Sequence, residues 1–213
     1  LTPAGVICEI IKDDGEMARM PDLVAFAQLH GLKIGTIADL IAYRRRTERF
    51  VERIMDTPFE SVHGGPFRLM LYKNTIVGAE LVALVHGRID PSKPTLVRMH
   101  TLSIFADIYG EKSERSDLLH RSMEIIGEAG TGVIVVINRP MQRLMSRAIE
   151  IKNSVRAGED APMEELRDYG VGAQILAELG VHDMILLTNS HRNIVAIEGY
   201  GLNIVGERPI LEG

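Results

Sequence analysis

Apolar and polar residues follow two different periods along this chain, and each period predicts a different element. Within residues 1–46, a Pro-Asp pair precedes apolar residues at helical spacing over 23–29, and Gly31 follows them. This order of signals predicts a helix that ends at the glycine. Thr36 and Asp39 have the spacing of a capping box, which predicts the start of a second helix.

Short apolar runs bounded by turn residues predict strands between the helices. In the first block these runs lie at 6–10 and 32–34. Residues 47–56 are predicted to be a connector. Beyond them we predict strands over 67–73, 80–88, 96–100, 133–137, 184–187 and 203–205, and helices over 117–128, 143–155, 169–179 and 189–197. Strands that alternate with helices are typical of an α/β architecture.

The composition is that of a globular protein and narrows the range of partners. Of the 213 residues, 46% are hydrophobic and 25% are charged, which are ordinary values for a chain with a core. The formal net charge of −5 argues against nucleic acid or an anionic membrane as a partner. The basic run from Arg44 to Arg46 lies at a predicted helix end, where the helix dipole favours basic residues, so we interpret it as a solvated cap.

Cys8 is the only cysteine in the chain. One cysteine forms no intrachain disulfide, which fits a reducing cytoplasm. Because Cys8 lies inside a predicted apolar strand, we expect its thiol to be buried. The N-terminal segment lacks the sectors of a signal peptide, and the chain begins without methionine in the middle of a pattern. We therefore expect a piece of a longer cytoplasmic polypeptide.

Two segments resemble known families. Residues 165–206, ELRDYGVGAQILAELGVHDMILLTNSHRNIVAIEGYGLNIVG, resemble the C-terminal half of GTP cyclohydrolase II. The earlier segments PAGVICEI, DDGEMARMPDL and HGLKIGTIADLIAYR resemble the end of 3,4-dihydroxy-2-butanone 4-phosphate synthase. Their order is that of the bifunctional riboflavin-biosynthesis proteins. The resemblance implies a GTP cyclohydrolase II-like α/β domain with a mixed sheet over 47–213, after a synthase remnant over 1–46, and it implies a homodimer.

The resemblance also implies a zinc site that this chain has changed. GTP cyclohydrolase II holds zinc with three cysteines in the spacing C-x10-C-x-C, shortly after a strand end that Arg98 and His100 match here. The three cysteine positions then fall on Ser103, Glu114 and Ser116. Neutral hydroxyls are poor zinc ligands, and two serines with one glutamate make no recognised zinc site. The resemblance therefore predicts that the domain has lost zinc and the hydrolysis of GTP.

The alternative to the loss of zinc is that other side chains bind the metal. His100 and His120 lie near the changed positions, His86 is a third histidine that could approach them, and imidazoles also bind zinc. No two of them have the i, i+4 spacing that places both rings on one helical face. An active GTP cyclohydrolase II with a rearranged metal site is thus the second hypothesis.

The nucleotide loop of the family is changed as well. Where the family has Arg-Gln-Glu-Gly-Arg, residues 138–142 read NRPMQ. Val136 takes the place of a tyrosine, and Leu119 aligns near a glutamine that contacts guanine. Proline fixes φ and removes a backbone donor, so the loop geometry must differ along with its charge.

Later positions of the family pattern are kept. Glu165 stands where the family has a catalytic aspartate, and Arg167 matches the adjacent catalytic arginine. Thr188 ends a predicted strand just before a helix N-terminus, which favours a phosphate, and Arg192 replaces a nucleotide-binding lysine. For these residues a structural role is the alternative: Thr188 or its neighbour caps the helix, and Arg167 forms an ion pair.

Three further candidates complete the set. Arg98 and His100 are predicted to contact a nucleotide, by their match to the family strand end. Glu9 matches a catalytic residue of the synthase, where a carboxylate moves protons. The metal ligands of that family lie upstream of this segment, so magnesium is expected only for the full-length synthase, and this chain is expected to hold no metal.

The main hypothesis is a riboflavin-biosynthesis protein fragment whose second domain serves the fused synthase by binding or as a scaffold. The ligands considered are GTP, phosphate and flavin-pathway compounds. Other enzymes of the pathway are further candidate partners, while nucleic acid and membranes are not expected.

Overall fold

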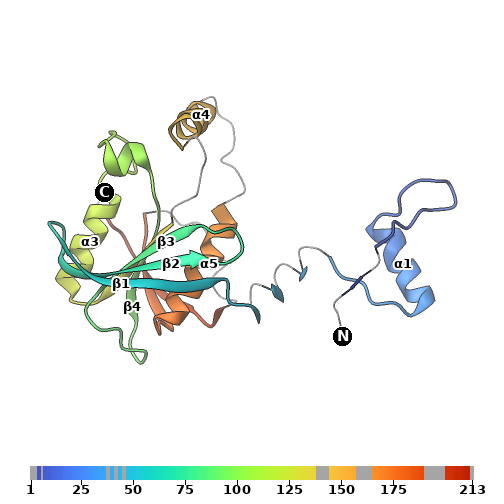
Figure 1. Ribbon diagram of the computed structural model, residues 1–213, viewed down its shortest axis with the longest axis horizontal. Helices are drawn as coiled ribbons and strands as arrows, with labels where there is room; N and C mark the ends of the chain where they lie inside the picture. Colours follow the sequence, from blue (N-terminus) through green and yellow to red (C-terminus); the bar gives the residue numbers. More distant parts are fainter. Residues whose placement is uncertain are drawn as a thin grey trace. The chain divides into compact units, whose positions relative to one another are not determined.

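The computed structural model describes residues 4–5, 7–36, 39–40, 43–44, 47–137, 144–156, 165–189 and 200–211. The chain divides into two compact units, Leu1–Arg44 and Arg45–Gly213. The first is drawn in blue in Figure 1, and the second carries all remaining colours.

The first unit is built around α1 (Met20–His30), as the helical spacing predicted. Asp22 accepts a hydrogen bond from the backbone N–H of Arg19 at 2.9 Å, and Gly31 ends the helix with a φ of 63°. The capping box at Thr36 is also confirmed, because the backbone N–H of Asp39 donates to Thr36 Oγ1 at 3.0 Å.

The strands predicted in the first unit are wrong. The described residues of 6–10 and 32–34 form no strand, and the described part of the unit contains a single β-bridge, between Ile11 and Met17. A strand needs a ladder of partners for its backbone groups. Here the carbonyl oxygen of Ile10 accepts one hydrogen bond from the N–H of Ala18, and the N–H of Leu32 donates to Ala27 at the end of α1, so the described residues make local contacts and no ladder. The prediction that the Cys8 thiol is buried is wrong for the same reason, since Cys8 is exposed.

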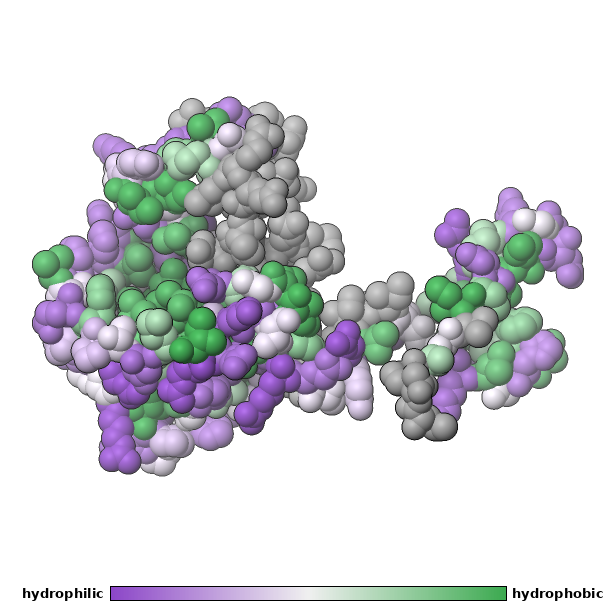
Figure 2. All heavy atoms as spheres, viewed as in Figure 1, coloured by the Kyte–Doolittle hydropathy of each residue, from purple (hydrophilic) through white to green (hydrophobic). Residues whose placement is uncertain are grey.

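Apolar side chains cover much of the surface of the first unit. Ala27 is the only residue of α1 that is buried, and Figure 2 shows apolar residues in green among the polar ones of this unit. The large exposed apolar residues are Ile7, Ile11, Met17, Met20, Val24, Phe26, Leu29, Leu32, Ile34, Leu40 and Tyr43. A unit that buries so little lacks a core of its own.

The second unit contains a seven-stranded sheet in the order β1-β2-β3-β5-β4-β6-β7. Strands β1, β2, β3 and β5 pair antiparallel, whereas β5, β4, β6 and β7 pair parallel. The mixed α/β sheet predicted for this part of the chain is therefore confirmed. The strands are β1 (Val51–Ser61), β2 (Gly65–Asn74), β3 (Glu80–His86), β4 (Thr95–Thr101), β5 (Gly132–Ile137), β6 (Asp183–Leu187) and β7 (Asn203–Arg208).

Strand β1 occupies much of the segment predicted to be a connector. It begins at Val51 and forms one edge of the sheet, where all its residues from Glu52 to Glu60 are exposed. A strand that buries neither face has no need for alternating apolar residues. The sequence pattern therefore gave no sign of it.

Helices cover both faces of this sheet. The second unit adds η1 (Ile104–Ile108), a single π-helical turn, and α3 (Leu118–Ala129), α4 (Leu144–Arg156) and α5 (Glu165–Glu178). Ile175 of α5 packs in one core cluster with Val133 and Val135, whereas Ile126 of α3 packs in the other with Ile134. Successive residues of β5 thus enter different cores, as the two-residue period of a strand requires. Figure 1 shows α3 and α5 against the sheet.

Candidate functional site

A closed polar cluster lies where β4 ends and η1 begins. His100 of β4 is fully buried, and its Nε2 lies 2.9 Å from Oδ2 of Asp107, whose side chain is 3% exposed. The same Asp107 oxygen accepts a hydrogen bond from the backbone N–H of Ser103 at 2.7 Å. The cluster therefore ties the end of the strand to the following turn, and its imidazole has no surface open to a dissolved ligand.

Opposing effects act on the pKa of the Asp107 carboxyl. Burial raises this pKa, while the hydrogen bonds from His100 and from the Ser103 N–H lower it, and the net result lies below the ordinary value of 3.8. The carboxylate is therefore the form that the folded protein favours.

This lowered pKa predicts an acid dependence of stability. Asp107 binds its proton more readily in the unfolded chain, so its stabilising contribution is fully present above pH 3.8 and is lost as the pH falls through the lower folded-state pKa. Unfolding in urea at a series of pH values measures this. The stability difference between the wild type and Asp107→Asn, which does not titrate at this site, should shrink below pH 3.8. A constant difference would contradict the prediction.

Two of the three residues predicted to stand at the family's cysteine positions have local structural roles. Ser103 Oγ accepts a hydrogen bond from the backbone N–H of Ala106 at 3.3 Å and caps η1. Ser116 Oγ donates to the carbonyl oxygen of Glu111 at 2.6 Å. Glu114 is exposed to solvent. Two hydrogen-bonded hydroxyls and one solvated carboxylate do not fit zinc, which binds thiolate, imidazole and carboxylate ligands in a tetrahedron.

The histidines considered as replacement ligands lie apart. His86 of β3 is opposite Gly132 at the start of β5, whereas His100 of β4 is opposite Val136 near its end. His120 of α3 stacks on His63 instead, with ring centroids 4.1 Å apart. Within the described parts of the chain, no group of three or more His, Cys, Asp and Glu residues is arranged to hold a metal ion.

His63 was not among the residues singled out from the sequence. It follows β1, and its Nδ1 lies 3.1 Å from Oε1 of Glu124 on α3. Because strand β1 was not predicted, no sequence signal placed this turn beside α3.

The sheet brings Arg98 close to Leu187, the residue before Thr188. Arg98 Nη1 donates a hydrogen bond to the carbonyl oxygen of Leu187 at 2.9 Å, which links β4 to the end of β6. The backbone N–H of Thr188 donates to the carbonyl oxygen of Arg208 at 3.0 Å. Asn189 Oδ1 accepts a hydrogen bond from the backbone N–H of Ile210 at 2.7 Å, so it fixes the C-terminal segment.

The remaining candidates are placed only in part. Glu165 and Arg167 lie in the first turn of α5, and nothing is described of their side chains. Arg192, the loop 138–142 and the helix predicted at 189–197 lie outside the described residues, apart from Asn189. Glu9 is exposed in the first unit. The catalytic and nucleotide-binding roles of all seven candidates therefore stay predictions.

Among the described residues, no helix combines the length and apolar character that a membrane span requires.

Two protein families match different parts of the chain. The GTP cyclohydrolase II family matches residues 52–209, and the 3,4-dihydroxy-2-butanone 4-phosphate synthase family matches residues 1–43. The first match covers most of the chain and includes every strand of the sheet except the first residue of β1.

Relatives match the chain along nearly its whole length. It is 44% identical to the riboflavin biosynthesis protein RibBA of Aquifex aeolicus, over 99% of this chain and 54% of that protein. It is 40% identical to the monofunctional riboflavin biosynthesis protein RIBA 2, chloroplastic, of Arabidopsis thaliana, over 99% of this chain and 45% of that protein. The chain thus spans about half the length of these relatives.

A solved structure matches as well. It is the crystal structure of RibBX from A. baumannii, described as a two-domain 3,4-dihydroxy-2-butanone 4-phosphate synthase. The TM-score is 0.56 at 34% identity, and the match covers 95% of this chain and 52% of that one. Together these matches confirm the resemblance found in the sequence: the chain belongs to the GTP cyclohydrolase II family, and a segment of the 3,4-dihydroxy-2-butanone 4-phosphate synthase family precedes that domain.

Proposed function

We propose that the chain is part of a riboflavin-biosynthesis protein in which the GTP cyclohydrolase II domain has lost zinc and GTP hydrolysis. The observation that carries the proposal is the state of Ser103, Glu114 and Ser116. The two hydroxyls are used in local hydrogen bonds and the carboxylate is solvated. Without the Lewis acid that the family's cysteines hold, there is no activated water to attack the purine.

We further propose that this domain supports the fused synthase by binding a ligand or as a scaffold. We propose that the domains are residues 1–46 and 47–213. The two matched ranges and the two compact units support a division in this region of the chain. The exposed apolar side chains of the first unit support the presence of a fused synthase, because the rest of a synthase domain would cover them. RibBX, a two-domain synthase by its description, is a precedent for the arrangement.

Zinc content and formate release test the loss of the reaction. We expect purified wild-type protein to contain well below about one zinc per chain and to release no formate from GTP, with or without added zinc or magnesium. The control is the triple variant Ser103→Cys, Glu114→Cys, Ser116→Cys, which restores the family spacing and is expected to retain zinc, because thiolates are strong zinc ligands. Stoichiometric zinc in the wild type together with formate release would overturn the proposal in favour of a rearranged metal site.

The synthase half is tested in the full-length protein. We expect conversion of ribulose 5-phosphate with magnesium present, and none by the 213-residue chain alone, since Glu9 is only one carboxylate of that site. A full-length protein inactive in this reaction would remove the function that the second domain is proposed to support. A homodimer, a cytoplasmic location and contacts with other pathway enzymes remain part of the proposal.

A further inference from the structure

A groove of about 530 Å³ opens between the sheet of the second unit and the C-terminal end of α5. Arg53, Arg68 and Arg88 line it together with Glu178. It lies beside the end of β3, and that end is paired with Gly132 at the beginning of β5. The cysteine positions of the family follow the opposite, C-terminal end of β4. The groove is therefore separate from the site described above.

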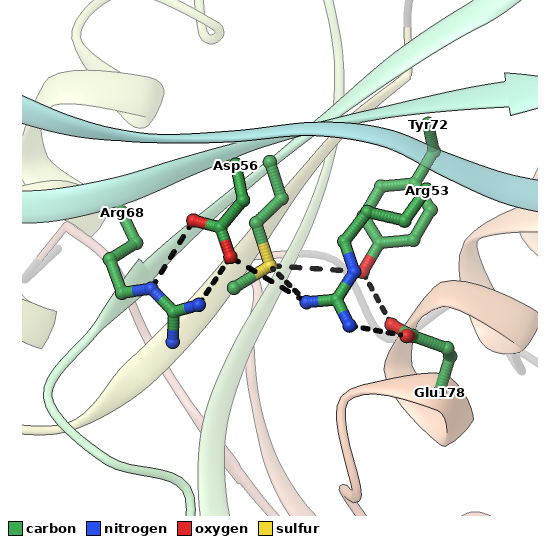
Figure 3. A network of polar contacts seen from close by, with 6 residues as sticks. Arg53, Asp56, Arg68, Tyr72 and Glu178 are labelled. Carbon is green, nitrogen blue, oxygen red and sulfur yellow. Dashed lines mark hydrogen bonds and ion pairs between the residues drawn. The ribbon is translucent and has the colours of Figure 1, made fainter.

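The acidic groups at the groove already have their hydrogen-bond donors. Figure 3 shows Glu178 between Arg53, whose Nη2 is 2.9 Å from Oε1, and Tyr72, whose hydroxyl donates to Oε2 at 2.6 Å. Asp56 accepts hydrogen bonds from both Nε and Nη2 of Arg68. Burial, and then the hydrogen bond to Glu178, raise the pKa of Tyr72, so this phenol stays protonated and continues to donate.

Donors remain in excess after these pairs are made. Each guanidinium carries five N–H donors and no acceptor. Arg68 uses one edge on Asp56 while its side chain is 56% exposed. The guanidinium of Arg88 has no hydrogen-bond or ion-pair partner among the residues that the structure describes. Three arginines and one carboxylate, Glu178, line the groove, and Asp56 pairs with Arg68 beside it. A ligand that brings acceptors and negative charge therefore fits this groove best.

The rest of the lining is apolar. Ile89, which follows β3, and Leu179, which follows α5, are half-buried, whereas Met70 and Val85 of the sheet are almost fully buried. Removing apolar ligand surface from water against such a wall is favourable, and a cavity of this size accommodates a small organic molecule. The groove thus offers an apolar wall beside unpaired guanidinium donors.

We propose that this groove binds a small molecule that carries a phosphate or carboxylate group on an apolar body. The planar guanidinium groups of Arg68 and Arg88 bind the oxyanion through paired N–H donors, as arginine does in proteins. Ile89 and Leu179 contact the apolar body. The site is independent of the zinc question, since none of its residues belongs to the family's cysteine positions.

Calorimetric titration of the chain with phenyl phosphate and with benzoate, in buffer free of phosphate and sulfate, tests this. We expect saturable binding of at least one of the two, and the preferred probe distinguishes phosphate from carboxylate. Arg88→Gln is expected to weaken it roughly tenfold or more, because one charge-assisted interaction is lost. Arg68→Gln should act in the same direction.

The matched control is Arg208→Gln, since Arg208 is an exposed arginine of β7 on the other edge of the sheet. This variant should bind like the wild type. Benzyl alcohol, which lacks the anion, should bind far more weakly than either probe. The proposal is overturned if neither anion binds the wild type, if benzyl alcohol binds as well as they do, or if Arg88→Gln, folded by circular dichroism, keeps full affinity.

Discussion

Asp107→Ala is expected to lower the free energy of unfolding by about 1–3 kcal/mol, the usual effect of leaving a buried hydrogen-bonding group without its partner. The substitution leaves the fully buried His100 without its 2.9 Å contact and leaves the backbone N–H of Ser103 without an acceptor. The imidazole is already short of one partner, because its buried Nδ1 has none among the described residues. Urea unfolding monitored by circular dichroism measures the change.

Glu114→Ala is the matched control for this experiment. Glu114 is another acidic residue of the same region, but it is exposed, and surface substitutions of this kind stay within about 0.5 kcal/mol. If Asp107→Ala costs no more than Glu114→Ala, the buried pair does not stabilise the end of β4, and our description of the cluster is wrong.

Gly64→Ala is the second substitution with a large expected effect, about 3 kcal/mol or more, since left-handed strain and overpacking add. Gly64 has a φ of 79°, and a Cβ built there lies 2.7 Å from the carbonyl carbon of Met123 in α3. That neighbour is helix backbone, which cannot move aside as a flexible side chain can. The turn between β1 and β2 would have to leave the helix.

Gly65→Ala separates the two causes. Gly65 has nearly the same φ, 80°, but a Cβ there meets nothing within 4 Å. It should cost only the left-handed strain, about 1–2 kcal/mol. Thermal and urea unfolding of both variants give the comparison, and equal losses would show that the close contact between this turn and α3 does not limit stability.

Local signals were enough for most helices and for the buried strands. The helix that ends at Gly31 and the capping box of Thr36 and Asp39 were predicted correctly, because each depends on residues within one turn of the chain. The apolar run of β5 was recognised for a similar reason, since a strand buried on both faces must be apolar throughout.

For the candidate site, the sequence predicted which residues take part but not which polar groups they contact. The resemblance to the family predicted that Ser103, Glu114 and Ser116 stand where cysteines would be, but it did not show that the two hydroxyls are used in local hydrogen bonds. The pairing of His100 with Asp107 was also missed. It depends on the chain turning back through η1, and no side-chain period predicts a π-helical turn.

The sequence by itself determined the family, the order of the two segments and the presence of a single cysteine, because these are properties of residue identity and spacing. The tertiary structure alone decided which polar groups meet. Arg53, Arg68, Arg88 and Glu178 come from separate segments and line one groove only because the sheet and α5 bring them together. The tertiary structure also decided edge strand β1. It is a strand because it pairs with β2, and its exposed side chains carry no strand pattern of their own.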